Sequence, residues 1–145
     1  MNIQNDHILS QLGHRLGLEL FFDKNQQCCL LLDQSLMVSI KQEASHWLFY
    51  GMLQDQLDNQ DKAFWQRLLV LNLSLAEKQA GTITYEPVSD ALLYVDALSI
   101  AQLDGEACYN FLEQFVHYLE YIKEQLLVTP NMVNNAKTIL MAHLN

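Results

Sequence analysis

Hydrophobic residues at helical spacing open the chain and then give way to a period of two. A helix is predicted over residues 5–16, ending at Gly17, with an apolar face made of Ile8, Leu9, Leu12 and Leu16. Residues 18–23 predict a strand with Leu18, Leu20 and Phe22 on one face. A polar turn separates them from a second predicted strand over residues 28–32, so the two are expected to form a hairpin.

The middle of the chain mixes strands with one long helix. The expected elements are strands over residues 36–40 and 46–53, a helix over residues 62–79, and strands over residues 82–86 and 91–96. Residues 46–53 are continuously apolar, which suits a strand buried on both faces. Three Asp residues precede the helix at positions 55, 58 and 61 and are interpreted as caps rather than metal ligands. Gly81 is expected to end the helix.

Two apolar stripes run along this central helix. One comprises Phe64, Leu68, Leu71 and Leu75, and the other comprises Trp65, Leu69 and Leu73. A helix that is apolar on nearly all sides must be covered on nearly all sides. Other helices of the chain are one candidate cover for the second stripe, and a second copy of the helix is another. We favour the second copy, because few other elements remain to cover it.

The last predicted elements are helical. A long helix is expected from about Ala101 to Leu126, with Ser99 and Gln102 at capping-box spacing and Asp104 as a competing start. Thr129 followed by Pro130 predicts the start of a short terminal helix.

The order of these elements predicts an α+β fold in a single domain. It runs helix, three or four strands, helix, two strands, helix, with an antiparallel twisted sheet flanked by helices. The domain is expected to span residues 1–127, and residues 128–145 form a C-terminal extension.

Composition and charge exclude several classes of protein. The chain carries 8 Lys and Arg against 17 Asp and Glu, a formal net charge of −9. Nucleic acids and anionic membranes are therefore not expected as partners. No apolar run approaches the ~20 residues of a membrane span, and no signal peptide is visible. The three cysteines form no CxxC motif, which favours a reducing compartment, so we expect a cytoplasmic protein.

A search for catalytic and metal-binding motifs finds none that is convincing. The chain lacks a glycine-rich phosphate loop and the HExxH, GxSxG and EF-hand patterns. Its five histidines are scattered, and Asp104 and Glu106 are interpreted as helix-start residues. We expect no enzyme, no metal and no cofactor. A small hydrolase or ligand-binding domain is the least favoured hypothesis, because it requires a cluster of titratable residues.

One apolar feature of the strands is unexplained by a single buried face. Phe21, Cys29, Leu31 and Met37 lie opposite that face, although a face that met water should be polar. Either a helix of the same chain covers these residues, or they receive a partner.

These patterns resemble one family, the class I type III secretion chaperones (the Tir-chaperone-like family). The matching patterns are Leu-Gly-Leu-Glu-Leu-Phe-Phe-Asp at 16–23, Cys28-x-Leu30-x-Leu32-Asp33, Leu36-x-Val38-x-Ile40, Tyr50-Gly51-x-Leu53, Leu71-Asn72-Leu73, Gly81 before a strand, and Leu112-Glu113-x-Phe115-Val116. The resemblance covers about residues 5–126. Gln34 stands where the family often has a second Asp, and the residues after 128 extend past its usual end.

The resemblance implies a homodimer that binds the N-terminal region of one or more secreted effectors in the bacterial cytoplasm and keeps them competent for export. It implies effector-binding residues at Leu12, Leu16, Phe21, Cys29, Leu31 and Met37. It also implies a dimer interface at Trp65, Leu69, Asn72 and Leu73. The export ATPase of the secretion apparatus is a further candidate partner. The alternative is a regulatory or structural interaction module of the secretion system on the same fold.

Overall fold

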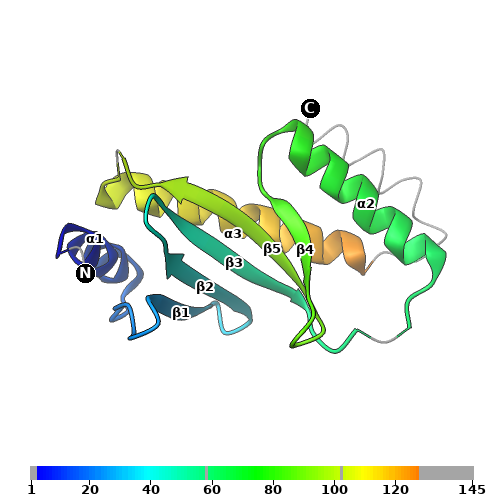
Figure 1. The fold of residues 1–145 in the computed structure, drawn as a ribbon, viewed down its shortest axis with the longest axis horizontal. Helices are drawn as coiled ribbons and strands as arrows, with labels where there is room; N and C mark the ends of the chain where they lie inside the picture. The colour runs from blue at the N-terminus through cyan, green and yellow to red at the C-terminus, as the bar shows by residue number, and fades with distance from the viewer. Residues whose placement is uncertain (1–2, 58, 102, 128–145) are drawn as a thin grey trace. The chain divides into compact units, whose positions relative to one another are not determined.

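The computed structural model describes residues 3–57, 59–101 and 103–127. Its elements are α1 (Ile3–Leu16), β1 (Gln27–Leu32), β2 (Leu36–Gln42), β3 (His46–Gln54), α2 (Lys62–Glu77), β4 (Thr82–Glu86), β5 (Ala91–Ser99) and α3 (Gly105–Leu126). The strands form one sheet in the order β1-β2-β3-β5-β4, with antiparallel pairing of β1 with β2, β2 with β3 and β4 with β5 (Figure 1). The α+β class is confirmed. No helix within the described ranges is long and apolar enough to cross a membrane.

The chain divides into two compact units that interleave along the sequence. One comprises the described parts of Met1–Gly51 and Ala97–Val116, and the other those of Met52–Asp96 and His117–Asn145. A domain over residues 1–127 stays a prediction. The predicted helix after Pro130 lies outside the described residues, as do Asp58 and Gln102 of the predicted caps.

Aromatic and aliphatic side chains fill the core of the first unit. Alternate residues of β1, β2 and β3 are buried there, namely Cys28, Leu30, Leu36, Val38, Ile40, Trp47 and Phe49. The Phe49 ring lies 4.8 Å from that of Phe111 and 5.7 Å from that of Phe115, measured between centroids, so the first half of α3 covers this face. The opposite face of the hairpin is therefore not the one that α3 covers.

In the second unit, α2 packs along β4. Phe64, Leu68, Leu71 and Leu75 of α2 are buried, as the first predicted stripe requires. Tyr94 of β5 is buried, and its hydroxyl donates a hydrogen bond to the carbonyl of Ala80. Burial raises the pKa of this phenol, so it stays protonated and keeps the donor role.

The predicted strand over residues 18–23 is wrong, because these residues form no strand. The N–H of Leu18 donates to the carbonyl of Gly13 at 2.8 Å, and Gly17 has a φ of 71°, so the chain turns back at the end of α1. A Cβ added at Gly13 would lie 2.5 Å from the oxygen of Leu18, which shows how closely the segment follows the helix. The hairpin is formed by β1 and β2 instead.

Two further predictions need correction. The helix expected from Ala101 begins at Gly105, because Asp104 provides the cap by accepting the Ala107 N–H at 2.7 Å. Strand β3 is not buried on both faces, since buried residues alternate with half-buried ones along it. The cap predicted at Asp61 is confirmed, because its carboxylate accepts the N–H of Phe64 at 2.9 Å.

The end of α2 differs from the predicted stop at Gly81. The N–H groups of Gln79 and Ala80 donate to the carbonyls of Ala76 and Leu75, which is the bonding of a Schellman motif. Gln79 therefore occupies the left-handed position, with a φ of 51°. Gly81 serves a different purpose, because a Cβ there would lie 2.5 Å from the carbonyl oxygen of Val95.

We predict that Gln79→Gly raises the free energy of unfolding by about 1 kcal/mol, since glycine adopts the left-handed conformation without steric cost. Gly17→Ala should lower it by a similar amount, because Gly17 occupies the same position at the end of α1 and an added Cβ there meets no atom within 4 Å. Urea denaturation measures both changes. The motif would be contradicted if Gln79→Gly were no more stable than the parent protein and Gly17→Ala were no less stable.

Candidate functional site

The outer side of the β1–β2 hairpin carries a row of side chains, which we call the hairpin face: the exposed Cys29, Leu31 and Met37 and the half-buried Ser39. Leu31 and Met37 are 56% and 58% exposed and lie directly opposite each other in the pairing. Cys29 lies opposite Ser39, with 3.8 Å between the sulfur and the hydroxyl oxygen. The sequence leaves two alternatives open for this face, a covering helix of the same chain or a partner. Among the described residues, no helix covers Leu31 or Met37.

The backbone of β1 adds hydrogen-bonding groups to this surface. The Gln42 N–H donates to the Gln26 carbonyl at 2.9 Å, which fixes the phase of the antiparallel ladder. In this phase the backbone groups of Gln27, Cys29 and Leu31 point away from β2. Since β1 is an outer strand of the sheet, these groups face its open edge.

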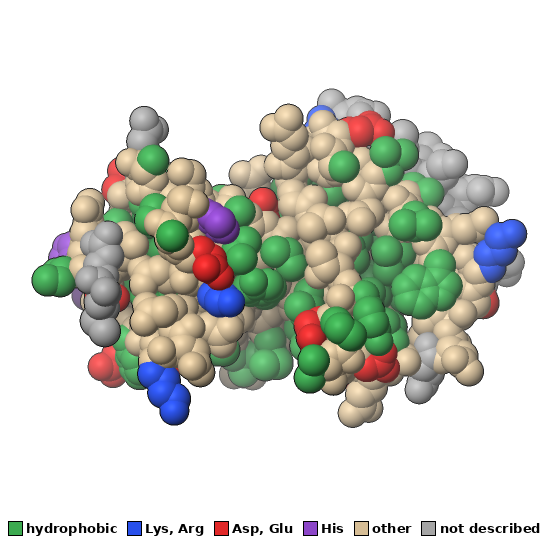
Figure 2. Space-filling model, in the orientation of Figure 1, with side chains coloured by type: hydrophobic (Ala, Val, Ile, Leu, Met, Phe, Trp, Pro, Cys, Tyr) green, Lys and Arg blue, Asp and Glu red, His purple; other side chains and the backbone are tan. Residues whose placement is uncertain are grey.

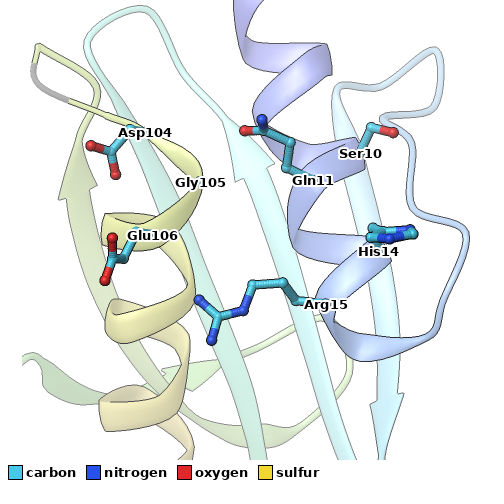
Figure 3. Close-up of a pocket in the computed structure, with 7 residues that line it drawn as sticks. All are labelled: Ser10, Gln11, His14, Arg15, Asp104, Gly105 and Glu106. Atoms are coloured by element: carbon cyan, nitrogen blue, oxygen red, sulfur yellow. The ribbon is translucent and has the colours of Figure 1, made fainter.

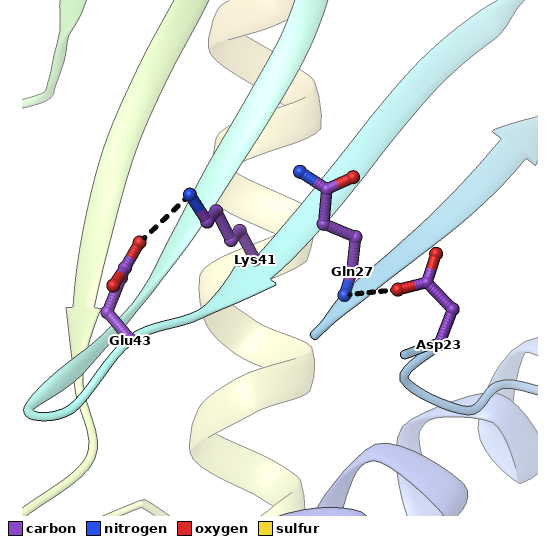
Figure 4. Close-up of polar contacts among 4 residues, drawn as sticks. All are labelled: Asp23, Gln27, Lys41 and Glu43. Carbon is purple, nitrogen blue, oxygen red and sulfur yellow. Dashed lines mark hydrogen bonds and ion pairs between the residues drawn. The ribbon is translucent and has the colours of Figure 1, made fainter. Parts of the chain in front are cut away.

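Asp23 occupies the beginning of that edge (Figure 4). Its carboxylate accepts the Gln27 N–H at 3.0 Å, and its own N–H donates to the Gln27 carbonyl at 2.9 Å. No residue within 3–57, 59–101 or 103–127 makes the equivalent bonds to Cys29 or Leu31 at this edge. Two consecutive outward-facing residues of β1 are thus available for strand pairing.

Phe21 lies beside the start of this strand. It is 68% exposed and lines a hollow of about 250 Å³ together with Asp6, Phe22 and Gln26. Of its lining residues, Gln26 accepts a hydrogen bond from the side-chain amide of Gln42 at 2.8 Å, and Gln42 accepts one from Asn5 at 2.9 Å. An apolar side chain of a partner would fit such a hollow.

The two sequence-predicted residues of α1 differ from the rest of the predicted binding set. Leu12 is fully buried, and Leu16 is half-buried. Leu12 therefore belongs to the buried side of α1 and not to an exposed surface.

The second apolar stripe of α2 is exposed, as Figure 2 shows by the hydrophobic side chains along this helix. Trp65, Leu69 and Leu73 are 40%, 63% and 56% exposed. Asn72 is different, because its side-chain amide is bonded to β4 within the same chain. Three of the four residues predicted for a dimer interface thus form a surface, and the fourth supports it.

The three thiols have unlike environments. Cys29 is exposed, whereas Cys28 and Cys108 are buried. Burial raises the pKa of the Cys28 thiol and raises that of Cys108 to about 12. The two buried thiols are therefore held in the unreactive protonated form.

A larger hollow of about 710 Å³ lies between α1 and the start of α3 (Figure 3). Its lining residues are Ser10, Gln11, His14, Arg15, Asp104, Gly105 and Glu106. Arg15 reaches toward α3, where its guanidinium carbon lies 3.6 Å from the centroid of the Tyr109 ring, while Asp104 and Glu106 point away from α1. The charged groups of the hollow thus do not converge on one point. Among the described residues, no cluster of His, Cys, Asp and Glu could hold a metal ion.

Sequence reasoning missed part of the surface. Tyr50 of β3 lies opposite Ser39, and Leu48 lies opposite Lys41, so both share the side of the sheet that carries the hairpin face. Both are half-buried. The continuous apolar run of β3 suggested burial on both sides and concealed this continuation.

Comparison with known proteins gives a consistent fold. A model of the Tir chaperone protein (CesT) family matches residues 7–123. A chain of the ExsC–ExsE complex is similar at 18% identity with a TM-score of 0.74, covering 87% of this chain and 97% of that one. A chain of the HopA1–SchA chaperone–effector complex is similar at 14% identity with a TM-score of 0.71, covering 84% and 94%.

A third similar chain comes from the ExoU–SpcU heterodimer of the Pseudomonas aeruginosa type III secretion system, at 14% identity with a TM-score of 0.62, covering 86% of this chain and 98% of that one. At these low identities, the three structures show that the fold is similar. The family match extends from α1 through most of α3, and the chain belongs to the Tir chaperone protein (CesT) family.

Proposed function

We propose that this protein is a type III secretion chaperone that binds the N-terminal region of one or more effectors in the bacterial cytoplasm and keeps them competent for export. One observation carries the proposal: the same hairpin has exposed apolar side chains and an open strand edge. Leu31 supplies both, since its side chain is on the hairpin face and its backbone faces the edge. The proposed role is binding and not catalysis.

The proposed mode of binding is strand addition. An extended effector segment pairs with Cys29 and Leu31 of β1, and its alternate side chains contact Leu31 and Met37. Backbone hydrogen bonds supply affinity for any extended segment, while the apolar contacts select for hydrophobic residues at alternate positions. The excess of acidic residues favours effectors whose flanking residues are basic.

We further propose that two copies associate through the exposed stripe of α2. Trp65, Leu69 and Leu73 recur every four residues, which is the spacing of one helix face. Two such faces packed together would remove large apolar side chains from water. Asn72 contributes indirectly, because its bonds to β4 fix the helix that carries the stripe.

We predict that Leu31→Asp weakens binding of an effector segment at least about a hundredfold, because a carboxylate would be desolvated in an apolar contact. The probe is the N-terminal region of a secreted protein encoded by a neighbouring reading frame, and titration calorimetry measures the affinity. Gln34→Asp adds the same charge at the hairpin turn and should bind as the parent does.

Thermal unfolding accompanies this test. Leu31→Asp should change the free energy of unfolding by less than about 1 kcal/mol, since Leu31 is exposed. If the variant unfolds, Leu31 belongs to the core; if it folds and binds normally, the hairpin face is not the binding site. Capture of a partner that the cell never secretes would favour the regulatory module.

A second prediction uses Cys29 as a reporter. In the folded protein a thiol reagent should modify Cys29 alone, because Cys28 and Cys108 are buried. Binding of the effector segment should block this reaction for as long as the complex persists. Cys29→Ser should abolish the rapid labelling, and labelling that proceeds at the same rate in the complex would place the effector elsewhere.

A third prediction concerns the proposed dimer. Leu69→Asp should weaken self-association at least about a hundredfold, because it places a charge in the middle of the apolar stripe. Light scattering across a concentration series measures the mass. Gln114→Asp adds the same charge to an exposed position of α3 and should leave the mass unchanged. A parent protein that is monomeric at micromolar concentration would contradict the proposal.

A further inference from the structure

Asn72 makes an unusual set of bonds from α2 to the neighbouring strand. Its Nδ2 donates to the carbonyl of Ile83 at 3.3 Å, and its Oδ1 accepts the N–H of Ile83 at 2.9 Å. The same Oδ1 accepts the hydroxyl of Thr82 at 3.0 Å. One side chain thereby satisfies both backbone groups of one strand residue.

These backbone groups belong to an open edge of the sheet. Strand β4 has a single neighbour, β5, and Ile83 lies opposite Tyr94 in that pairing. The N–H and the carbonyl of one strand residue point to the same side of the strand. Since both groups of Ile83 bond to Asn72, they face away from β5, which is the direction from which another strand would approach.

The two outer strands therefore differ. In β1 the edge groups of Cys29 and Leu31 have no partner among the described residues, whereas in β4 the edge residue Ile83 is bonded to a side chain. Strand β4 spans only Thr82–Glu86, so its outward-facing residues are Ile83 and Tyr85, and blocking Ile83 leaves Tyr85 alone. An added strand needs consecutive outward-facing residues, and β4 cannot offer them while Asn72 stays in place.

We propose that Asn72 is a specificity-determining residue that closes the β4 edge to strand addition. The consequence is that an extended partner is directed to β1, and only this consequence rests on the proposed function. The amide suits the task because it donates and accepts at once, matching both groups of one residue. A carboxylate keeps the acceptor and loses the donor, while alanine removes both.

The test compares Asn72→Ala with Asn72→Asp in the full chain, with Gln66→Ala as a control at an exposed position of the same helix. Two quantities are measured: the amide hydrogen exchange of Ile83, and the mass of the assembly by sedimentation across a concentration series. The exchange of Leu93, which lies opposite Thr84 inside the ladder, monitors the fold.

At the lowest concentration of the series, where the freed edge is unpaired, Asn72→Ala is expected to accelerate exchange at Ile83 at least about tenfold while leaving Leu93 near the parent rate. At higher concentrations the freed edge should drive association beyond the state of the parent protein. Asn72→Asp should leave both the exchange of Ile83 and the mass near the parent values, because the acceptor and the obstructing side chain remain. Gln66→Ala should change neither quantity.

Unchanged exchange at Ile83 in Asn72→Ala at the lowest concentration would overturn the proposal. So would faster exchange with no added association, since Asn72 would then only tie α2 to β4. If Leu93 exchanges as fast as Ile83, the same measurements are made on Asn72→Ser, whose shorter side chain cannot reach both backbone groups. Failure of any effector segment to protect Cys29 would contradict strand addition at β1 and leave the result on the β4 edge standing.

Discussion

The register of the β1–β2 hairpin decides which of the hairpin's side chains meet solvent together. A shift of one residue would turn one strand over relative to the other, so that Leu31 would share a face with Val38 instead of Met37. Because both faces are apolar, hydrophobicity alone distinguishes them poorly. The turn at Asp33 and Gln34 and the bonds of Asp23 to Gln27 therefore fix the register, and with it the surface offered to a partner.

The second unit meets the same difficulty on a helix. Two apolar stripes run along α2, and either could face the strands. The cap at Asp61 sets where the helix starts, and the bonds of Asn72 to Ile83 set which side faces β4. Polar contacts at a few positions thus choose between apolar faces that packing alone would leave nearly equivalent.

Periodicity in the sequence predicts most of the elements and their apolar faces, including the two stripes of α2 and the apolar second face of the hairpin. The strand at 18–23 could not be excluded, because its alternation is genuine and alternation does not reveal that the segment runs back so close to Gly13 of α1. The roles of Asn72 and Asp23 were also hidden. A sequence pattern shows which side chains are polar or apolar. Asn72 and Asp23 instead bond to backbone groups, and the direction of those groups is known only once the sheet pairing is known.

The exposed apolar side chains are too few to hold a partner alone. Full burial of a residue such as Leu31, Met37 or Phe21 contributes about 1.5–3 kcal/mol, and each is already partly buried, so together they supply on the order of 5 kcal/mol. Association costs about 4–15 kcal/mol before any side chain is ordered. Stable binding therefore requires further contacts along an extended segment, including backbone pairing at the β1 edge. Under that condition, keeping other edges closed matters as much as keeping one edge open.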